Sequence, residues 1–237
     1  MEPHHVKVGD SSDHSRRVRV VHISDTHRRH AEFAKAIPDG DILVHSGDFD
    51  SFSLAKLPLL RLLEEREIGK VAAFFDSQSH QHKVFVPGNH DMRLASYHLA
   101  GGRGRGSLAS RLASSCHVLI DSEVTLCGLK FYGIPWCPLR DASYARAFSE
   151  PWESLLPRWQ AAPADTDVLV THIPPWEELG REVRERIRPL ALLHGHIHRG
   201  NGVKYWEKGG SDSSVLVSNA AMDEIPKPVV IDFYHES

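Results

Sequence analysis

The sequence predicts an α/β fold in which mixed β-sheets are covered by helices. In the first half of the chain, short apolar runs alternate with helical stretches, and in the second half strands predominate. The 237 residues, of which 41% are hydrophobic and 25% charged, are enough to bury one core. We therefore expect one domain at residues 18–237, preceded by a flexible polar tail at residues 1–17 without an apolar secretory segment.

The predicted strands are short apolar or β-branched runs that are bounded by turn residues, as is typical of buried strands. They are Val18–Ser24, Asp41–His45, Lys83–Pro87, His117–Ile120, Val124–Leu126, Leu129–Ile134, Asp167–Thr171, Leu190–His194, Ser214–Ser218 and Val229–Tyr234.

Helices are predicted where apolar residues recur at helical spacing. Leu179, Val183 and Ile187 lie four residues apart among charged residues, so they form one apolar face. Pro58 and Pro157 are expected to bound helices, because a proline inside a helix removes a backbone hydrogen bond. The predicted helices are Glu67–Asp76, Pro151–Trp159 and Glu177–Arg188.

The composition limits the partners and the compartment. A net charge of −3 and a pI near 6.6 indicate neither a nucleic-acid partner nor a membrane surface. Cys116, Cys127 and Cys137 predict free thiols in a reducing compartment, so we expect a cytoplasmic protein of undetermined oligomeric state. Gly101–Gly106 (GGRGRG) is interpreted as a surface loop rather than an RNA- or phosphate-binding segment, because it lacks a strand–loop–helix frame.

Five short polar motifs follow predicted strands. Each residue taken alone is most simply a cap or turn residue. Because ligands bind at the carboxyl ends of strands in open α/β sheets, however, five such endings together predict a binding site. The motifs are Ile23–His27 (ISDTH), Ser46–Asp48 (SGD), Pro87–Asp91 (PGNHD), Thr171–His172 (TH) and His194–His198 (HGHIH).

The spacing and the residue types favour metal binding. In extended backbone, residues i and i+2 point to the same side, so Asp25 and His27 are expected to face one ion together. His196 and His198 have the same spacing. Carboxylate, amide and imidazole ligands without a thiolate suit Mn, Fe, Zn or similar ions, and two such ions can clamp a phosphate. Glycines between the ligands are expected to permit tight turns and close backbone approach.

The ordered set DxH, GD, GNHD, TH and GHxH resembles the calcineurin-like metallophosphoesterases, and this resemblance covers Val18 to Tyr234. Further stretches, such as DSEVTLCGLKFYGIPW and HGHIHRGNG, resemble the small metallophosphoesterase-domain-containing subgroup. The resemblance implies a four-layer α/β/β/α sandwich with two mixed β-sheets and a dinuclear metal site at the strand C-terminal ends. It also implies two divalent metal ions, with manganese expected in vitro and iron, zinc, magnesium or cobalt as alternatives.

Residue roles follow from the same resemblance. It implies that a hydroxide held between the metals attacks phosphorus, that His90 donates a proton to the leaving group, and that Asp91 orients His90. Asp91 has a second interpretation as the N-cap of a helix that begins at Met92. The implied ligands are Asp25, His27 and His198 for the first metal, Asp48 as the bridge, and Asn89, His172 and His196 for the second metal.

The expected activity is hydrolysis of phosphodiesters on small nucleotides or cyclic nucleotides. A phosphomonoesterase or protein phosphatase is the alternative, because the same site supports either reaction. A nuclease is disfavoured by the acidic pI, and a non-catalytic scaffold is disfavoured because no ligand of the motif set is missing. The expected partner is thus a small phosphoester substrate rather than a membrane or a nucleic acid.

Other residues near the motifs have less specific interpretations. His22 and His45 are expected to make structural hydrogen bonds. Asn219 ends a strand and is a candidate to support the site from behind the ligands. Trp136 and Trp176 follow prolines after strands, and either stacking on a nucleobase or core packing fits them.

Overall fold

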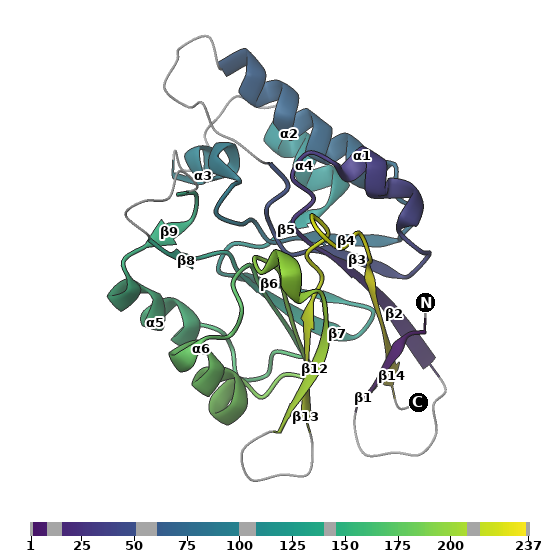
Figure 1. The fold of residues 1–237 in the computed structure, drawn as a ribbon, viewed down its shortest axis with the longest axis vertical. Helices are drawn as coiled ribbons and strands as arrows, with labels where there is room; N and C mark the ends of the chain where they lie inside the picture. The colour runs from purple at the N-terminus through teal and green to yellow at the C-terminus, as the bar shows by residue number, and fades with distance from the viewer. Residues whose placement is uncertain are drawn as a thin grey trace.

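Two six-stranded sheets pack face to face, and helices cover their outer faces (Figure 1). The computed structural model describes residues 2–8, 16–50, 61–99, 108–139, 146–207 and 214–235. The layers follow in the order α/β/β/α, which confirms the expected fold class. Pro58 and the glycine-rich Gly101–Gly106 lie outside the described residues.

The first sheet contains the amino-terminal strands. From β2 to β5 its strands are parallel, whereas β14 runs antiparallel to β2. The carboxyl ends of β2, β3 and β4 therefore lie on one edge of the sheet. In spatial order the strands are β1 (His4–Val8), β14 (Val229–His235), β2 (Arg16–Ile23), β3 (Ile42–His45), β4 (His82–Phe85) and β5 (His117–Val118).

The second sheet has a parallel centre and antiparallel edges. Strands β13, β11, β10 and β7 are parallel, and β12 and β6 pair with them antiparallel at the two sides. In spatial order the strands are β12 (Gly202–Glu207), β13 (Ser214–Asn219), β11 (Ala191–His194), β10 (Val168–Thr171), β7 (Leu129–Ile134) and β6 (Ser122–Leu126). A separate parallel pair joins β8 (Cys137–Pro138) to β9 (Ser149–Glu150).

The space between the sheets is an apolar core. Val20 and Val44 from the first sheet and Phe131 and Val170 from the second are fully buried in the same cluster. Gly133 on β7 lies so close to the first sheet that a Cβ there would come within 2.4 Å of Leu119 and 2.8 Å of Val86. This close packing brings the strand ends of both sheets to one region.

Helices cover the outer faces of both sheets (Figure 1). Among the described residues, no helix combines the length and apolar character that crossing a membrane requires. On the side of the first sheet are α1 (His30–Phe33), η1 (Ala34–Ala36), α2 (Arg61–Asp76), α3 (Met92–Leu99) and α4 (Leu108–Ser115). On the side of the second sheet are α5 (Trp152–Gln160), α6 (Glu177–Arg181) and η3 (Glu182–Ile187), and η4 (His198–Gly200) follows β11.

Two helical predictions need correction. Pro157 lies inside α5, not at its end. The helix tolerates it because Pro157 is on the exposed face, while Leu155 and Trp159 anchor the opposite face in the core. The segment predicted as one helix from Glu177 to Arg188 changes after Arg181 into a π-helical turn, whose last hydrogen bond joins Arg188 N–H to Val183 O at 3.0 Å.

The N-terminal segment also differs from the expectation of a flexible tail. His4–Val8 forms β1, which pairs in parallel with β14, and Arg16 and Arg17 already belong to β2. The alternating residues of β1 are only partly buried, so its apolar pattern is weak in the sequence. The three cysteines are free thiols, as predicted.

Candidate metal centre

A first cluster consists of Asp25, His27 and His198, from the loops that follow β2 and β11. Asp25 Oδ1 lies 3.2 Å from His198 Nε2 and 3.9 Å from His27 Nε2, and the two imidazole nitrogens are 3.2 Å apart. The other carboxylate oxygen, Oδ2, accepts the His196 N–H at 2.9 Å. Asp25 Oδ1 is buried and accepts no hydrogen bond from the described residues. It is therefore positioned to bind a cation together with the two imidazoles.

The far sides of these two imidazoles face acceptors. His27 Nδ1 donates to the carbonyl oxygen of Asp50 at 3.1 Å, because a carbonyl can only accept. His198 Nδ1 lies 3.2 Å from Asp223 Oδ2. With a proton on each Nδ1, both Nε2 lone pairs point into the cluster, as metal ligands require.

A second cluster consists of Asp48, Asn89, His172 and His196, from the loops after β3, β4, β10 and β11. His172 Nε2 lies 3.1 Å from Asp48 Oδ2, 3.0 Å from Asn89 Oδ1 and 3.2 Å from His196 Nδ1. His196 Nδ1 is also 3.1 Å from Asn89 Oδ1. Both sheets thus contribute to one cluster of oxygen and nitrogen atoms.

The orientation of these atoms is set mainly by backbone groups. His172 Nδ1 donates to the carbonyl oxygen of Ser46 at 2.9 Å, which leaves Nε2 as the atom facing the cluster. Asp48 Oδ1 accepts the His90 N–H at 2.8 Å and leaves Oδ2 facing His172. Burial lowers the pKa of His172, but the Asp48 carboxylate outweighs burial and raises that pKa to about 10. A proton therefore competes with a cation for this position.

Both clusters fit divalent cations. Lone pairs of carboxylate, amide and imidazole groups face one another at about 3 Å, which is unfavourable unless positive charge lies between them. The donor set has no thiolate, so it suits manganese, iron, zinc and similar ions rather than a structural cysteine-bound zinc. The described residues thus provide two adjacent metal-binding groups.

The backbone at Asp25 and His27 is not extended, so the expectation that extended backbone points both side chains to one side is wrong. Asp25, His27, Asp48 and His196 have φ values of 50°, 40°, 56° and 68°, in the left-handed region. The side chains of Asp25 and His27 converge because the chain turns tightly after the strand, not because it remains extended. Left-handed non-glycine residues cost free energy and are concentrated at functional sites.

Glycines next to the ligands are required for close approach, as predicted. A Cβ on Gly88 would lie 2.3 Å from Asp48 Oδ1 and 2.7 Å from His172 Nδ1. A Cβ on Gly195 would lie 2.0 Å from Ser24 Oγ and 2.2 Å from Asp25 Oδ2. Any side chain at either position would displace a ligand.

His90 lies beside both clusters. Its ring is in edge contact with the His27 ring, with the centroids 5.0 Å apart, and its Nε2 is 4.0 Å from Asp48 Oδ2. The side chain is 33% exposed, so it is accessible to a bound molecule.

The Asp91 carboxylate is buried behind the site and connects two ligand loops. It accepts backbone N–H groups of Asp48, Phe49, Asp50 and Gly88 at 2.7–3.1 Å. Burial and the nearby charge of Asp48 raise the pKa of Asp91 to about 7, whereas the amide hydrogen bonds favour the anion. The carboxylate therefore fixes the loop that carries Asp48 against the loop that carries Asn89.

Three further polar residues have the structural contacts expected of them. His22 bridges Ser218 Oγ at 2.8 Å and Ser46 Oγ at 2.9 Å. His45 accepts the Gly47 N–H at 3.2 Å, and its Nε2 lies 3.0 Å from Thr26 Oγ1. Asn219 Nδ2 donates to the carbonyl oxygen of Ile197 at 2.8 Å and so holds the segment between His196 and His198.

The two candidate tryptophans lie in different environments. Trp136 is buried, donates to Asp121 Oδ2 at 2.7 Å, and has the Arg158 guanidinium 4.0 Å from its ring centroid. These contacts favour core packing for Trp136. Trp176 is half-buried and lies edge-on to His196, with the ring centroids 5.9 Å apart, so it borders the site.

Sequence reasoning missed the groups that orient the ligand histidines. Two of them are the backbone carbonyls of Ser46 and Asp50, which no side-chain pattern reveals. The third is Asp223, which lies beyond the last metal-binding motif. The sequence gives one indication of this role: Asp223 lies four residues after Asn219, where β13 ends beside the site.

Comparisons with known proteins identify the family of the chain. The family model of the calcineurin-like phosphoesterases matches residues 18–200. A UPF0046 protein of Caenorhabditis elegans is 34% identical over 215 residues, which cover 79% of this chain and 71% of the relative. The human metallophosphoesterase domain-containing protein 1 is 28% identical over 272 residues, which cover 98% of this chain and 77% of the relative.

The fold is also found in a solved structure, a 5'-nucleotidase precursor from Thermus thermophilus. The TM-score is 0.50 at 18% identity, over 86% of this chain and 48% of that chain. The sequence matches establish the family of the chain, and the two clusters fit the metal site of that family. The chain belongs to the calcineurin-like phosphoesterases, in the group of the metallophosphoesterase domain-containing proteins, and is a metal-dependent phosphoester hydrolase.

Proposed function

We propose that the protein hydrolyses phosphodiesters of small nucleotides, including cyclic nucleotides. The observation that carries this proposal is the position of the His90 imidazole, partly exposed beside both clusters. The alkoxide that leaves a nucleotide diester is a poor leaving group, so its departure needs a proton donor at the site.

We assign the metal ligands as the sequence motifs imply. Asp25, His27 and His198 would hold one cation, and Asn89, His172 and His196 the other, with Asp48 shared between them. When bound, two divalent cations, with manganese as the proposed pair, supply Lewis-acid activation of water and neutralise charge on the phosphoryl oxygens.

The chain itself positions the substrate and moves the proton. Water adds to phosphorus and releases one proton to solvent, while the bond from phosphorus to the leaving oxygen breaks. His90 gives a proton to that oxygen and takes one up again from solvent after the product leaves. Asp91 contributes from behind, because its carboxylate fixes the backbone from Asp48 to Asp50 on which the geometry of His90 depends.

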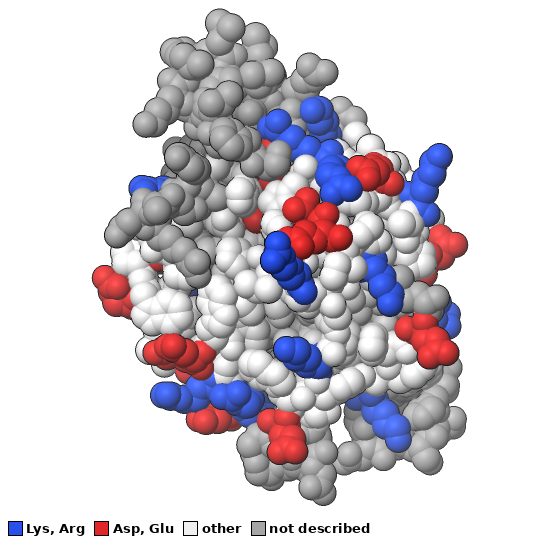
Figure 2. All heavy atoms as spheres, viewed as in Figure 1, with Lys and Arg blue, Asp and Glu red and all other residues white. Residues whose placement is uncertain are grey.

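The surface charge supports a small substrate. On the face shown in Figure 2, basic and acidic side chains of the described residues are interspersed and form no single-sign stripe. A polynucleotide would need a continuous basic track along its phosphates. A nucleotide needs only the cations and a few neighbouring groups, and Trp176 borders the site next to His196.

The test is a substrate screen with purified protein. With Mn²⁺ added, we expect hydrolysis of bis-p-nitrophenyl phosphate and of cyclic nucleotides, and loss of activity with EDTA. The p-nitrophenyl monoester is the matched control, because it differs by one ester group. Faster turnover of monoesters than of all diesters would overturn the proposal in favour of a phosphomonoesterase.

A further inference from the structure

Three histidines of the two clusters are not held in the same way. His27 and His172 donate through Nδ1 to backbone carbonyls, which no substitution removes. His198 instead faces a side chain, because Asp223 Oδ2 lies 3.2 Å from its Nδ1. The His198 side chain is also 32% exposed, so burial alone does not fix its ring.

We propose that Asp223 is the positioning residue of the first metal cluster, where its carboxylate keeps the proton of His198 on Nδ1 and leaves Nε2 to bind a cation beside Asp25. This inference rests on the proposed metal sites. An ionised carboxylate can only accept, so the imidazole nitrogen next to it is the protonated one. The opposite nitrogen then has a free lone pair, and it is the atom 3.2 Å from Asp25 Oδ1.

Asp223 is itself held in place by the loop that carries His27. Arg29 Nη1 donates to the Asp223 carbonyl at 2.9 Å and lies 3.6 Å from its Oδ1. The same guanidinium forms two hydrogen bonds to Glu32, at 2.8 and 3.0 Å. Arg29 therefore connects the turn after His27 to the carboxylate that orients His198.

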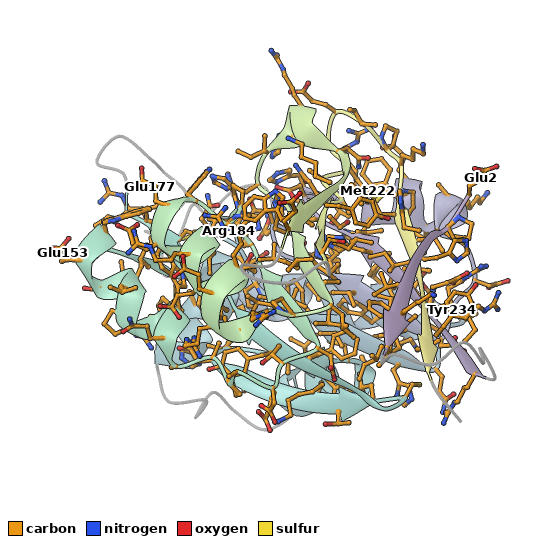
Figure 3. All side chains as sticks on the ribbon, turned by 90° about the horizontal axis from the view of Figure 1, so that it is seen from below. Glu2, Glu153, Glu177, Arg184, Met222 and Tyr234 are labelled. Atoms are coloured by element: carbon orange, nitrogen blue, oxygen red, sulfur yellow. The ribbon has the colours of Figure 1, made fainter. Side chains whose placement is uncertain are left out.

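The loop that carries Asp223 is also anchored to the site. Met222, labelled in Figure 3, is fully buried, and its N–H donates to the Ser24 carbonyl at 2.9 Å. Asn201 Nδ2 donates to the carbonyls of Ala221 and Lys227, each at 3.0 Å, which closes the loop. Asp223 thus has a defined position relative to Asp25.

The experiment is a manganese titration of metal-depleted protein by calorimetry, with Mn²⁺ electron paramagnetic resonance as a second readout. We expect wild type to bind two ions. In Asp223→Ala, one of the two should bind about 10–100-fold more weakly and the other should be unchanged. Asp223→Asn should lie between, because an amide oxygen still accepts from Nδ1 but has no charge.

Glu224→Gln is the matched control. Glu224 is the adjacent carboxylate in the same loop, and it pairs with the exposed Arg199 rather than with a ligand. This variant should titrate like wild type. The melting temperature of each metal-free variant separates positioning from folding, since positioning predicts no change.

The outcomes are distinct. If Asp223→Ala binds both ions as wild type does, or loses both together with a lower melting temperature, the positioning role is wrong. If Asp223→Asn binds Mn²⁺ as weakly as Asp223→Ala does, only the charge of Asp223 matters and the proton-holding role is wrong. If wild type binds no Mn²⁺, the metal assignment itself fails before Asp223 is tested.

Discussion

The two candidate metal clusters have similar side chains but different surroundings. In the second cluster, His172 is fully buried and the carbonyl of Ser46 and the N–H of His90 orient the ligands. In the first cluster, His198 is 32% exposed and a side-chain carboxylate orients it. The second cluster is therefore set by the main chain of the parallel strands, whereas the first depends partly on surface side chains.

This difference bears on metal exchange. Main-chain groups at strand ends move only if the sheets move, and both sheets are packed around a common core. Exposed ion pairs are weak and screened by salt. We therefore expect the second cluster to retain its ion when the first has lost one.

The largest effect on activity is expected from removing the Asp48 carboxylate, which lies next to His172. Asp48→Ala should lower activity by more than about 10³-fold, because this carboxylate is proposed to serve both ions. Metal analysis and turnover of a diester measure the change. Asp165→Asn, on an exposed residue that pairs with Lys130, is the control and should retain full activity. Retention of both ions in Asp48→Ala would contradict a shared role.

Next in size is the substitution of His90, which lies beside both clusters. His90→Gln should retain both ions but slow turnover by about 10²–10⁴-fold for poor leaving groups. Good leaving groups need less protonation, so nitrophenyl esters should be affected least. A series of diesters of graded leaving-group pKa gives the measurement. An equal loss across the series would remove the acid role.

A smaller effect is expected in a chelator competition. If the first cluster is the weaker one, wild-type protein should lose its two ions in separate steps as the chelator concentration rises. High salt should weaken the first step more than the second. Simultaneous loss of both ions at every salt concentration would show that the difference in surroundings has no thermodynamic consequence.

The last prediction concerns the dependence of the free energy of unfolding on pH. Burial lowers the pKa of His45 to about 3 and that of His194 to about 4, from an ordinary value of 6.5. As the pH falls below about 6.5, the unfolded chain takes up protons that the folded chain does not, so stability decreases. Urea unfolding of metal-free protein should therefore show a lower free energy of unfolding at pH 5 than at pH 7. Asp91 and His172, whose pKa values are raised to about 7 and about 10, act in the opposite direction, so the measured change is the balance of both sets of groups. A free energy of unfolding that rises from pH 7 to pH 5 would contradict the neutral, buried state of His45 and His194.

The sequence predicted the central strands well for a physical reason. Segments such as Leu129–Ile134 are apolar because both faces of each sheet are covered, so composition alone identifies them. The edge strands β1 and β12 were not predicted, because half-exposed strands mix apolar and polar residues. Pro157 was placed at a helix end because local propensity ignores the tertiary packing of Leu155 and Trp159.

The sequence indicated which polar residues gather at the strand ends, but not the groups that hold them in place. Asp, Asn and His at five strand ends form a pattern that no single structural role explains. Backbone conformation at Asp25 and Asp48 was not predictable, because the left-handed turn is imposed by contacts between loops far apart in sequence. Asp223 is a common residue type in a surface loop, and only its distance from His198 distinguishes it.

The central claim is that two neighbouring clusters each bind a cation. Anomalous scattering from a manganese-loaded crystal tests it most directly. We expect two peaks, one bonded to Asp25, His27 and His198 and the other to Asn89, His172 and His196, with Asp48 reaching both. A single peak, or density away from these side chains, would contradict the account.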